Sequence, residues 1–280
     1  MRRVLIAGCG YVGAELARRL VAAGDLVVAL RRREPPGGEG IVPLAADLAH
    51  PALLAGLARL PRPDAVVYAA SADVHEDTAY ETAYVTGVRN LLAALRASGA
   101  APRFVFVSST GVYGQHGGEW VDEDSPAEPA GFAGRRLLEG EHLVADSGLD
   151  GIVLRLGGIY GPGRVPLIES VLRGAAVIPE GEPRYTNRIH RDDAARALEH
   201  LLRLPRPDPL YLGVDCEPAP LSEVLRWIAR ELRMPEPPSG PGGAAASWTR
   251  GSKRCSNRRL LASGFRFEYP SYREGFRALF

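Results

Sequence analysis

A chain of 280 residues can form one large domain or one domain with a smaller annex. Its 34 basic and 33 acidic residues leave a formal net charge of +1, which gives no reason to expect nucleic acid or an anionic membrane as a partner. No apolar run is long enough to span a bilayer, and Cys9, Cys216 and Cys255 follow neither a disulfide nor a metal-ligand pattern. We therefore expect a cytoplasmic protein without a metal site.

The N-terminal segment carries the pattern of a dinucleotide-binding turn. A short apolar strand is followed at once by Gly8, Gly10 and Gly13, and helical periodicity begins after them. In such a turn the first glycine permits the sharp bend, the second lets the backbone approach a pyrophosphate, and the third lets the helix pack closely on the strand. The helix N-terminus then presents free N–H groups to the phosphates. We expect this turn, including Tyr11 and Val12, to bind a dinucleotide.

Apolar strands and amphipathic helices alternate along the chain. This alternation predicts parallel strands joined by right-handed crossovers, which is a Rossmann-type doubly wound α/β fold. The segment 235–243, rich in proline and glycine, is expected to be a flexible connection, and the aromatic tail 265–280 is expected to pack against the body. The expected strands are 3–7, 26–30, 65–70, 103–107, 151–156 and 210–214, and the expected helices are 51–59, 78–98, 135–145, 192–204 and 221–232.

Two arginines stand at the end of the second strand. A carboxylate about 20 residues past the glycines would hold the ribose 2′-OH of NAD, whereas an arginine there accommodates the 2′-phosphate of NADP. Arg31 and Arg32 occupy this place, and Glu34 is the first acidic residue after them. Because arginine pairs with phosphate in a bidentate way, NADP(H) is the expected cofactor, with NAD(H) as the alternative. The competing interpretation is that these arginines form a solvated surface turn.

Three further segments resemble motifs of a known family. They are V-S-S-T-G-V-Y-G at 107–114, L-R-L-G-G-I-Y-G-P-G at 154–163 and I-H-R-D-D-A-A at 189–195. In this order they are similar to the extended short-chain dehydrogenase/reductase family of sugar-nucleotide epimerases, dehydratases and reductases. The resemblance covers nearly the whole chain.

The resemblance implies an organisation in two parts. Residues 1–160 would form the dinucleotide-binding domain, with 186–215 returning to it. A small substrate-binding lobe would consist of 161–185 and 216–280 and would bind a small-molecule substrate. Paired helices of this fold often form dimers in the family, so a homodimer is one expectation, although the sequence leaves the oligomeric state open.

The resemblance also implies which residues contact the cofactor. Asp47 and its neighbour would flank the adenine, although Asp47 could equally cap a helix. The segment after the strand 65–70 would pass near the pyrophosphate and ribose. The full set expected downstream of the glycine turn is Asp47, Leu48, Ala69, Ala70, Ser71, Ser108, Gly158 and Ile159.

The residue expected to polarise a substrate carbonyl is Ser109. It matches the family's serine and stands at the carboxyl end of a predicted parallel strand, where open α/β sheets bind ligands. Thr110 is adjacent and could share the role. The alternative is that these hydroxyls only cap the chain after the strand.

Two departures from the family pattern put the chemistry in doubt. Gly8 and Gly10 are one residue closer than in the family's G-x-x-G opening. The family's Tyr-x-x-x-Lys pair is also missing. One alignment puts Ala133 and Leu137 in the places of the tyrosine and the lysine, and a shift by one residue puts Phe132 and Arg136 there. Lys253 is the only lysine of the chain. The pattern resembles the atypical branch of the family, which keeps the nucleotide fold without this pair.

Other residues could supply the missing functions. Tyr113 and Tyr160 flank the expected cleft, but a tyrosine in such turns is more often a packing residue, and a phenol needs a nearby cation to exchange protons near neutral pH. His190 and Tyr160 are expected to touch substrate, with a structural hydrogen bond of His190 to Asp192 or Asp193 as the alternative.

Two functions follow. The first is an NADP(H)-dependent oxidoreductase or epimerase-like enzyme acting on a carbonyl or sugar-type substrate with an unusual proton donor. The second is a nucleotide-binding sensor or scaffold with little or no chemistry. The retained glycines, arginines and serine favour cofactor binding in both, whereas the missing pair favours the second or an altered reaction.

Overall fold

The structure is a computed structural model that describes residues 1–52, 54, 57, 61–241 and 251–280. The chain forms two compact units, and each consists of three segments. Unit 1 comprises Met1–Val112, Glu128–Arg155 and Ala194–Tyr211. Unit 2 comprises Tyr113–Ala127, Leu156–Asp193 and Leu212–Phe280. Among the described residues, no helix has both the length and the apolar character needed to cross a membrane.

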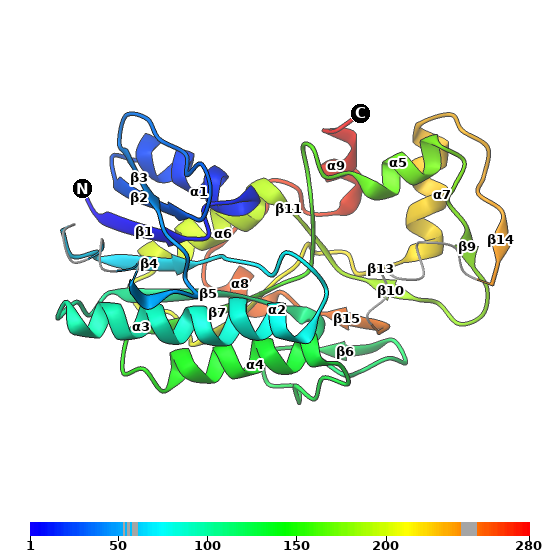
Figure 1. Cartoon of the computed structure of the whole chain (residues 1–280). Helices are drawn as coiled ribbons and strands as arrows, with labels where there is room; N and C mark the ends of the chain where they lie inside the picture. Colours follow the sequence, from blue (N-terminus) through cyan, green and yellow to red (C-terminus); the bar gives the residue numbers. More distant parts are fainter. Residues whose placement is uncertain (53, 55–56, 58–60, 242–250) are drawn as a thin grey trace. The chain divides into compact units, whose positions relative to one another are not determined.

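A seven-stranded sheet with the order β12-β7-β5-β4-β1-β2-β3 organises the fold (Figure 1). The pairs β1–β2, β2–β3, β1–β4 and β4–β5 are parallel. From β1 the chain proceeds to β2 and β3 on one side and then returns to β4 and β5 on the other, so the strand order reverses beside β1, where open sheets of this kind bind ligands. The strands are β1 Arg3–Ala7, β2 Leu26–Arg31, β3 Ile41–Ala45, β4 Ala65–Tyr68, β5 Arg103–Ser109, β7 Gly151–Leu156 and β12 Leu210–Gly213.

Helices cover both faces of this sheet, which confirms the predicted doubly wound α/β fold (Figure 1). The expected helix 78–98 is a continuous helical run with one π turn in its middle, and the expected helix 135–145 begins three residues earlier, at Phe132. The expected helix 51–59 includes residues outside the described ones. The helical elements are α1 Tyr11–Ala22, α2 Asp77–Glu81, the π-helix η2 Thr82–Thr86, α3 Gly87–Ala97, the 3-10 turn η3 Thr110–Val112, α4 Phe132–Ala145 and α6 Arg191–Arg203.

The core of unit 1 lies between the sheet and the helices. Tyr68, Phe104 and Phe106 are fully buried and the ring of Tyr68 contacts the other two, because they stand on the neighbouring strands β4 and β5. Val88 and Leu91 of α3 complete this face. The apolar face of α3 therefore packs on the sheet.

Unit 2 is built from short strand pairs and helices. Its pairs are β6 Glu119–Val121 with β15 Lys253–Cys255, β8 Gly158–Tyr160 with β11 Arg188–His190, β9 Ile178–Pro179 with β14 Ser239–Gly240, and β10 Tyr185–Thr186 with β13 Ala219–Pro220. Its helices are α5 Pro166–Leu172, α7 Leu221–Glu231, α8 Arg258–Ala262 and α9 Tyr272–Arg277. Trp227 of α7 and Tyr272 and Phe276 of α9 are buried together in its core.

Two segments differ from the sequence-based expectation. Within the expected flexible connection 235–243, Ile178 N donates a hydrogen bond to Pro238 O at 2.9 Å and Ser239–Gly240 forms β14, while residues 242–243 lie outside the described ones. The aromatic tail packs as expected and also forms α9, whose first turn carries a capping box made by Ser271 and Glu274.

Candidate cofactor and active site

The glycine turn joins β1 to α1 and has the close contacts that require glycine. Gly8 has φ +96°, and a Cβ there would lie 2.2 Å from Ala70 N. At Gly13 a Cβ would lie 2.7 Å from Gly8 O, so any side chain would push the helix off the turn. At Gly10, by contrast, a Cβ would meet no atom within 4 Å, which leaves open space in front of the N-terminus of α1. The turn therefore fits the pyrophosphate of a dinucleotide.

Three further residues belong to this turn or follow it directly. Tyr11 and Val12 open α1, and Val12 is buried. Cys9 is fully buried inside the turn, and burial raises the pKa of its thiol to about 11. The Cys9 thiol stays protonated near neutral pH, so it is not a reactive group.

The segment after β4 lies against the glycine turn. Ala69 N donates to Ala7 O at 2.8 Å, and the backbone of Ala69 and Ala70 lines the space next to Gly8. Ser71 follows and is exposed. The two chain segments that the sequence assigned to the pyrophosphate thus lie side by side at the carboxyl ends of β1 and β4.

The two arginines at the end of β2 have different surroundings. Arg31 is exposed. Arg32 Nη2 lies 2.6 Å from both carboxylate oxygens of Asp73, and this side-chain hydrogen bond raises the pKa of Arg32 and lowers that of Asp73. A 2′-phosphate could pair with Arg31 directly, but at Arg32 it would compete with Asp73.

Asp47 and Leu48 follow β3. Asp47 Oδ1 accepts a hydrogen bond from Ala49 N at 2.9 Å, and its Oδ2 lies 3.3 Å from His50 Nδ1. The carboxylate therefore caps its own turn. Leu48 is buried, and its carbonyl accepts from Asn90 Nδ2 at 2.9 Å.

Ser109 ends β5 with a hydroxyl group that can still donate. Its Oγ accepts a hydrogen bond from Gly111 N at 3.1 Å, which leaves its own proton for another partner. The side chain is half-buried, while Thr110 next to it is buried at the start of η3. Ser109 is thus the better placed of the two to contact a substrate oxygen.

Ser108 points into a buried network instead. Its Oγ donates to Glu141 Oε1 at 2.5 Å, and Arg155 binds the same carboxylate through Nε at 3.0 Å and Nη2 at 2.7 Å. All three side chains are buried, and they tie β5, α4 and β7 together. This network holds the carboxyl end of β5, from which Ser109 projects.

The positions of the family's Tyr-x-x-x-Lys pair lie on the first turns of α4. Ala133 and Leu137 are buried there. In the shifted alignment, Phe132 is half-buried, and Arg136 forms ion pairs with carboxylates of α2 and α4. The carboxylates paired with Arg136 are Asp77, Glu81 and Glu139.

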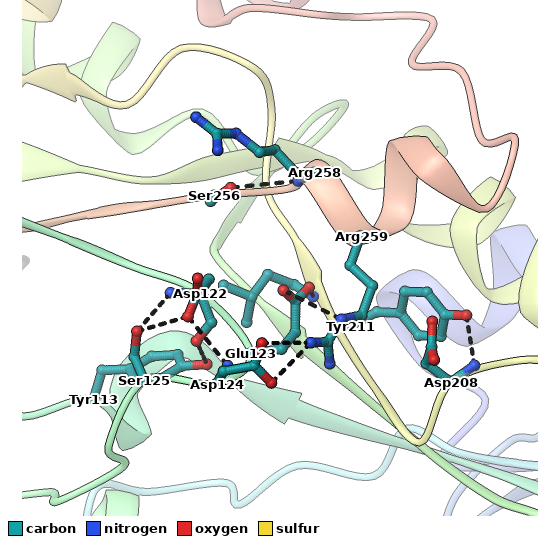
Figure 2. Close-up of polar contacts among 11 residues, drawn as sticks. Tyr113, Asp122, Glu123, Asp124, Ser125, Asp208, Tyr211, Ser256, Arg258 and Arg259 are labelled. Atoms are coloured by element: carbon teal, nitrogen blue, oxygen red, sulfur yellow. Dashed lines mark hydrogen bonds and ion pairs between the residues drawn. The ribbon is translucent and has the colours of Figure 1, made fainter.

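Tyr113 lies in unit 2 with its hydroxyl already engaged. The phenol is buried and donates to Asp122 O at 2.7 Å (Figure 2). Lys253, the only lysine of the chain, is also buried; its Nζ donates to Tyr113 O at 3.0 Å, and burial lowers its pKa. These contacts describe a packed tyrosine and give it no free proton to transfer.

Tyr160 and His190 face one buried polar cluster of unit 2. They stand opposite each other in the β8–β11 pair, with ring centroids 5.4 Å apart. His190 Nδ1 accepts from Asp192 N at 3.2 Å, and burial lowers the pKa of the imidazole. Arg188, two residues before His190, points to the same face, and Asp215 N donates to its carbonyl at 2.6 Å.

This cluster contains four polar side-chain atoms without a hydrogen-bond partner in the described structure. They are the Tyr160 hydroxyl, Arg188 Nη1, His190 Nε2 and Asp215 Oδ2. Burial raises the pKa of the Asp215 carboxyl to about 8 and lowers that of Arg188. The nearby α9 covers the Tyr160 hydroxyl, since a Cβ on Gly275 would lie 1.7 Å from it.

The last two expected cofactor residues, Gly158 and Ile159, belong to β8. Gly158 is exposed and its N–H donates to Asn187 O at 2.9 Å, while Ile159 is half-buried and pairs with Ile189 of β11. Both belong to unit 2.

A polar groove of about 290 Å³ lies next to β6 and β15 in unit 2. Its acidic groups already have partners: Asp124 binds Arg259 Nη2 at 2.9 Å, and Glu123 accepts from Leu212 N at 2.9 Å. Burial raises the pKa of the Glu123 carboxyl. Within the described ranges, this groove and the rest of the chain contain no cluster of His, Cys, Asp or Glu suited to a metal ion.

Comparisons with known proteins agree with this architecture. The model of the NAD-dependent epimerase/dehydratase family matches residues 4–211. A 3-diazoavenalumate denitrifying reductase from a Streptomyces species is 33% identical over 304 residues, covering 98% of each chain. A solved structure of a putative member of this family from Methylobacillus flagellatus is 39% identical, with a TM-score of 0.82 over 99% of this chain and 97% of its own.

A more distant structure shows the same fold. The UDP-glucose 4-epimerase of Thermus thermophilus, solved with NAD, has 24% identity and a TM-score of 0.81, covering 99% of this chain and 97% of its own. These matches confirm the resemblance to extended short-chain dehydrogenases/reductases. The chain belongs to the NAD-dependent epimerase/dehydratase family.

Proposed function

We propose that this chain is a reductase that uses NADP(H) and acts on a small substrate with a polarised double bond, such as a carbonyl. Ser109 carries the proposal, because its hydroxyl stands at the carboxyl end of β5 and keeps a proton to donate. The relative that matches this chain over 98% of both lengths is named a reductase, which favours reduction over epimerisation.

The chain's own residues divide the work of cofactor binding. Gly8, Gly10 and Gly13 hold the pyrophosphate at the N-terminus of α1, and Arg31 binds the 2′-phosphate. Bound NADPH supplies a hydride to the substrate. Ser109 donates a hydrogen bond to the substrate oxygen and stabilises the negative charge that develops there.

We also propose a compartment for the protein and a division of the chain into a cofactor part and a substrate part. In the described structure no disulfide joins the three cysteines, of which Cys9 and Cys255 are buried and Cys216 is exposed, and this suits a reducing compartment such as the cytoplasm. In the proposed organisation, residues 1–160 with 186–215 hold the cofactor and the remainder contributes to substrate binding.

The test is a pair of measurements on the whole chain. NADPH binding is followed by fluorescence titration, and NADPH oxidation is followed by the loss of its near-ultraviolet absorbance with aldehydes, ketones and nucleotide sugars as probes. The proposal expects binding and turnover, and Ser109→Ala lowers kcat by about 10²-fold or more with little change in NADPH affinity. Tight NADPH binding without turnover of any probe would favour the sensor or scaffold function, to which the missing Tyr-x-x-x-Lys pair points.

A further inference from the structure

An aromatic cluster with two titratable groups lies on the surface of unit 1. His75 Nδ1 is 3.4 Å from the hydroxyl of Tyr80, and their rings meet edge to face with centroids 5.4 Å apart. The ring of Phe132 contacts both, at 4.9 Å from His75 and 5.5 Å from Tyr80. The imidazole and the phenol are thus held together by a third ring that carries no exchangeable proton.

This cluster occupies the end of α4 where the family's tyrosine would stand. Phe132 is the first residue of α4 and, in the shifted alignment, takes the place of that tyrosine. Two residues later, a Cβ on Gly134 would lie 2.8 Å from Gly111 O, and Gly111 N donates to Ser109 Oγ. The same end of α4 therefore packs on the Ser109 turn and carries the cluster.

The backbone next to Tyr80 has an unusual conformation. The π-helix η2 follows α2 directly, and the buried hydroxyl of Tyr68 donates to Ala83 O inside it. Single π turns inserted in α-helices occur often at functional sites. Here the turn is fixed by Tyr68 and lies between Tyr80 and the long helix α3, and α2 runs beside α4 (Figure 1).

The charges around the pair come from the two helices that carry it. On α2 and just before it stand Glu76, Asp77 and Glu81, and on α4 stand Arg135, Arg136 and Glu139. Arg136 neutralises three of these carboxylates through ion pairs, and the side-chain hydrogen bond to Asp77 is the largest contribution that raises its pKa. Arg136 is therefore engaged with these carboxylates, whereas the imidazole nitrogen of His75 lies 3.4 Å from the Tyr80 hydroxyl.

We propose that Tyr80 is the proton donor of the reaction and that His75 returns the proton to it. This inference rests on the proposed function. When hydride adds to the carbonyl carbon, the C=O π bond breaks and its electron pair moves to the substrate oxygen. Tyr80 protonates that oxygen as its own O–H bond breaks. The resulting phenolate takes a proton from the imidazolium form of His75, and the neutral imidazole, which is exposed, regains a proton from solvent. Tyr80 is the catalytic residue, and His75 positions and recharges it.

The experiment compares Tyr80→Phe, His75→Asn and the control Tyr84→Phe, whose ring contacts Tyr80 with centroids 5.3 Å apart. Activity is measured as NADPH oxidation with the probe that the wild type reduces fastest. We expect Tyr80→Phe to lower kcat by about 10²-fold or more, His75→Asn to lower it less and to remove one limb of the pH profile between about pH 5 and 8, and Tyr84→Phe to resemble the wild type.

A second readout does not depend on turnover. The ring signals of His75 are recorded by NMR at one fixed pH in the wild type and in Tyr80→Phe. Removing the hydroxyl group that lies 3.4 Å from Nδ1 shifts the NMR signal of this ring nitrogen.

The outcomes separate this inference from the proposed function. An active wild type whose kcat survives Tyr80→Phe, or falls equally in Tyr84→Phe, overturns the role of Tyr80 and leaves the reductase standing. Unchanged His75 ring signals in Tyr80→Phe overturn the pairing itself. A wild type that reduces none of the probes contradicts the reductase, and the proton donor falls with it.

Discussion

Replacing Arg155 by Met tests the buried network under the active-site strand. Arg155 and Glu141 have side chains only 7% and 8% exposed, and two hydrogen bonds of 3.0 and 2.7 Å join them. Removing the guanidinium leaves a buried carboxylate that keeps its bond from Ser108, and breaking such a pair costs about 3–5 kcal/mol. At about 2–4 °C per kcal/mol for a chain of this size, Tm falls by about 6–20 °C.

The assay is thermal unfolding followed by circular dichroism, with two controls. The double variant Glu141→Leu with Arg155→Met removes both charges and recovers most of the lost Tm, since the cost comes from the unpaired ion. Arg226→Met breaks the exposed pair with Glu236 and changes Tm far less. A single Arg155→Met variant as stable as the wild type would refute this reasoning.

Three other variants test separate parts of the structure. Gly13→Ala places a Cβ 2.7 Å from Gly8 O and displaces the turn, so NADPH affinity measured by fluorescence falls by about tenfold or more; unchanged affinity would contradict the fit of the turn. Asp73→Asn removes the carboxylate that holds Arg32, so Arg32 can bind a 2′-phosphate and NADPH binds about two- to fivefold more tightly, while NADH binding does not change. An equal effect on both nucleotides would contradict a 2′-phosphate site. Burial raises the pKa of Asp215 to about 8 in the folded chain, so its contribution to stability falls as pH rises from about 4 to 8. The Tm of the wild type, measured relative to that of Asp215→Asn, therefore decreases across this range. A Tm difference that stays constant with pH would contradict the raised pKa.

Local patterns in the sequence predicted the parts of the fold that depend on neighbouring residues. The glycine spacing predicted the β1 turn, because φ +96° at Gly8 and the contacts of Gly13 are consequences of residue type at fixed offsets. The amphipathic pattern also predicted the helix 78–98. The same pattern did not reveal the π turn at Thr82–Thr86, since one extra residue in a turn leaves no distinctive composition.

Contacts between distant segments could not be predicted in the same way. Glu141 is 33 residues from Ser108, and nothing in the sequence selects it as the partner. The same holds for His75 and Tyr80, which approach the start of α4 only because α2 packs on it. The side chains that the motifs suggested as proton donors, Tyr113 and Tyr160, are buried among backbone carbonyls and rings.

Calorimetric titration of the whole chain with NADPH and with NADH tests the proposed cofactor site most directly. We expect NADPH to bind more tightly than NADH, and we expect Arg31→Ala to remove this preference while NADH binding stays the same. Tighter NADH binding that persists in Arg31→Ala, or no heat with either nucleotide, would contradict the proposed site.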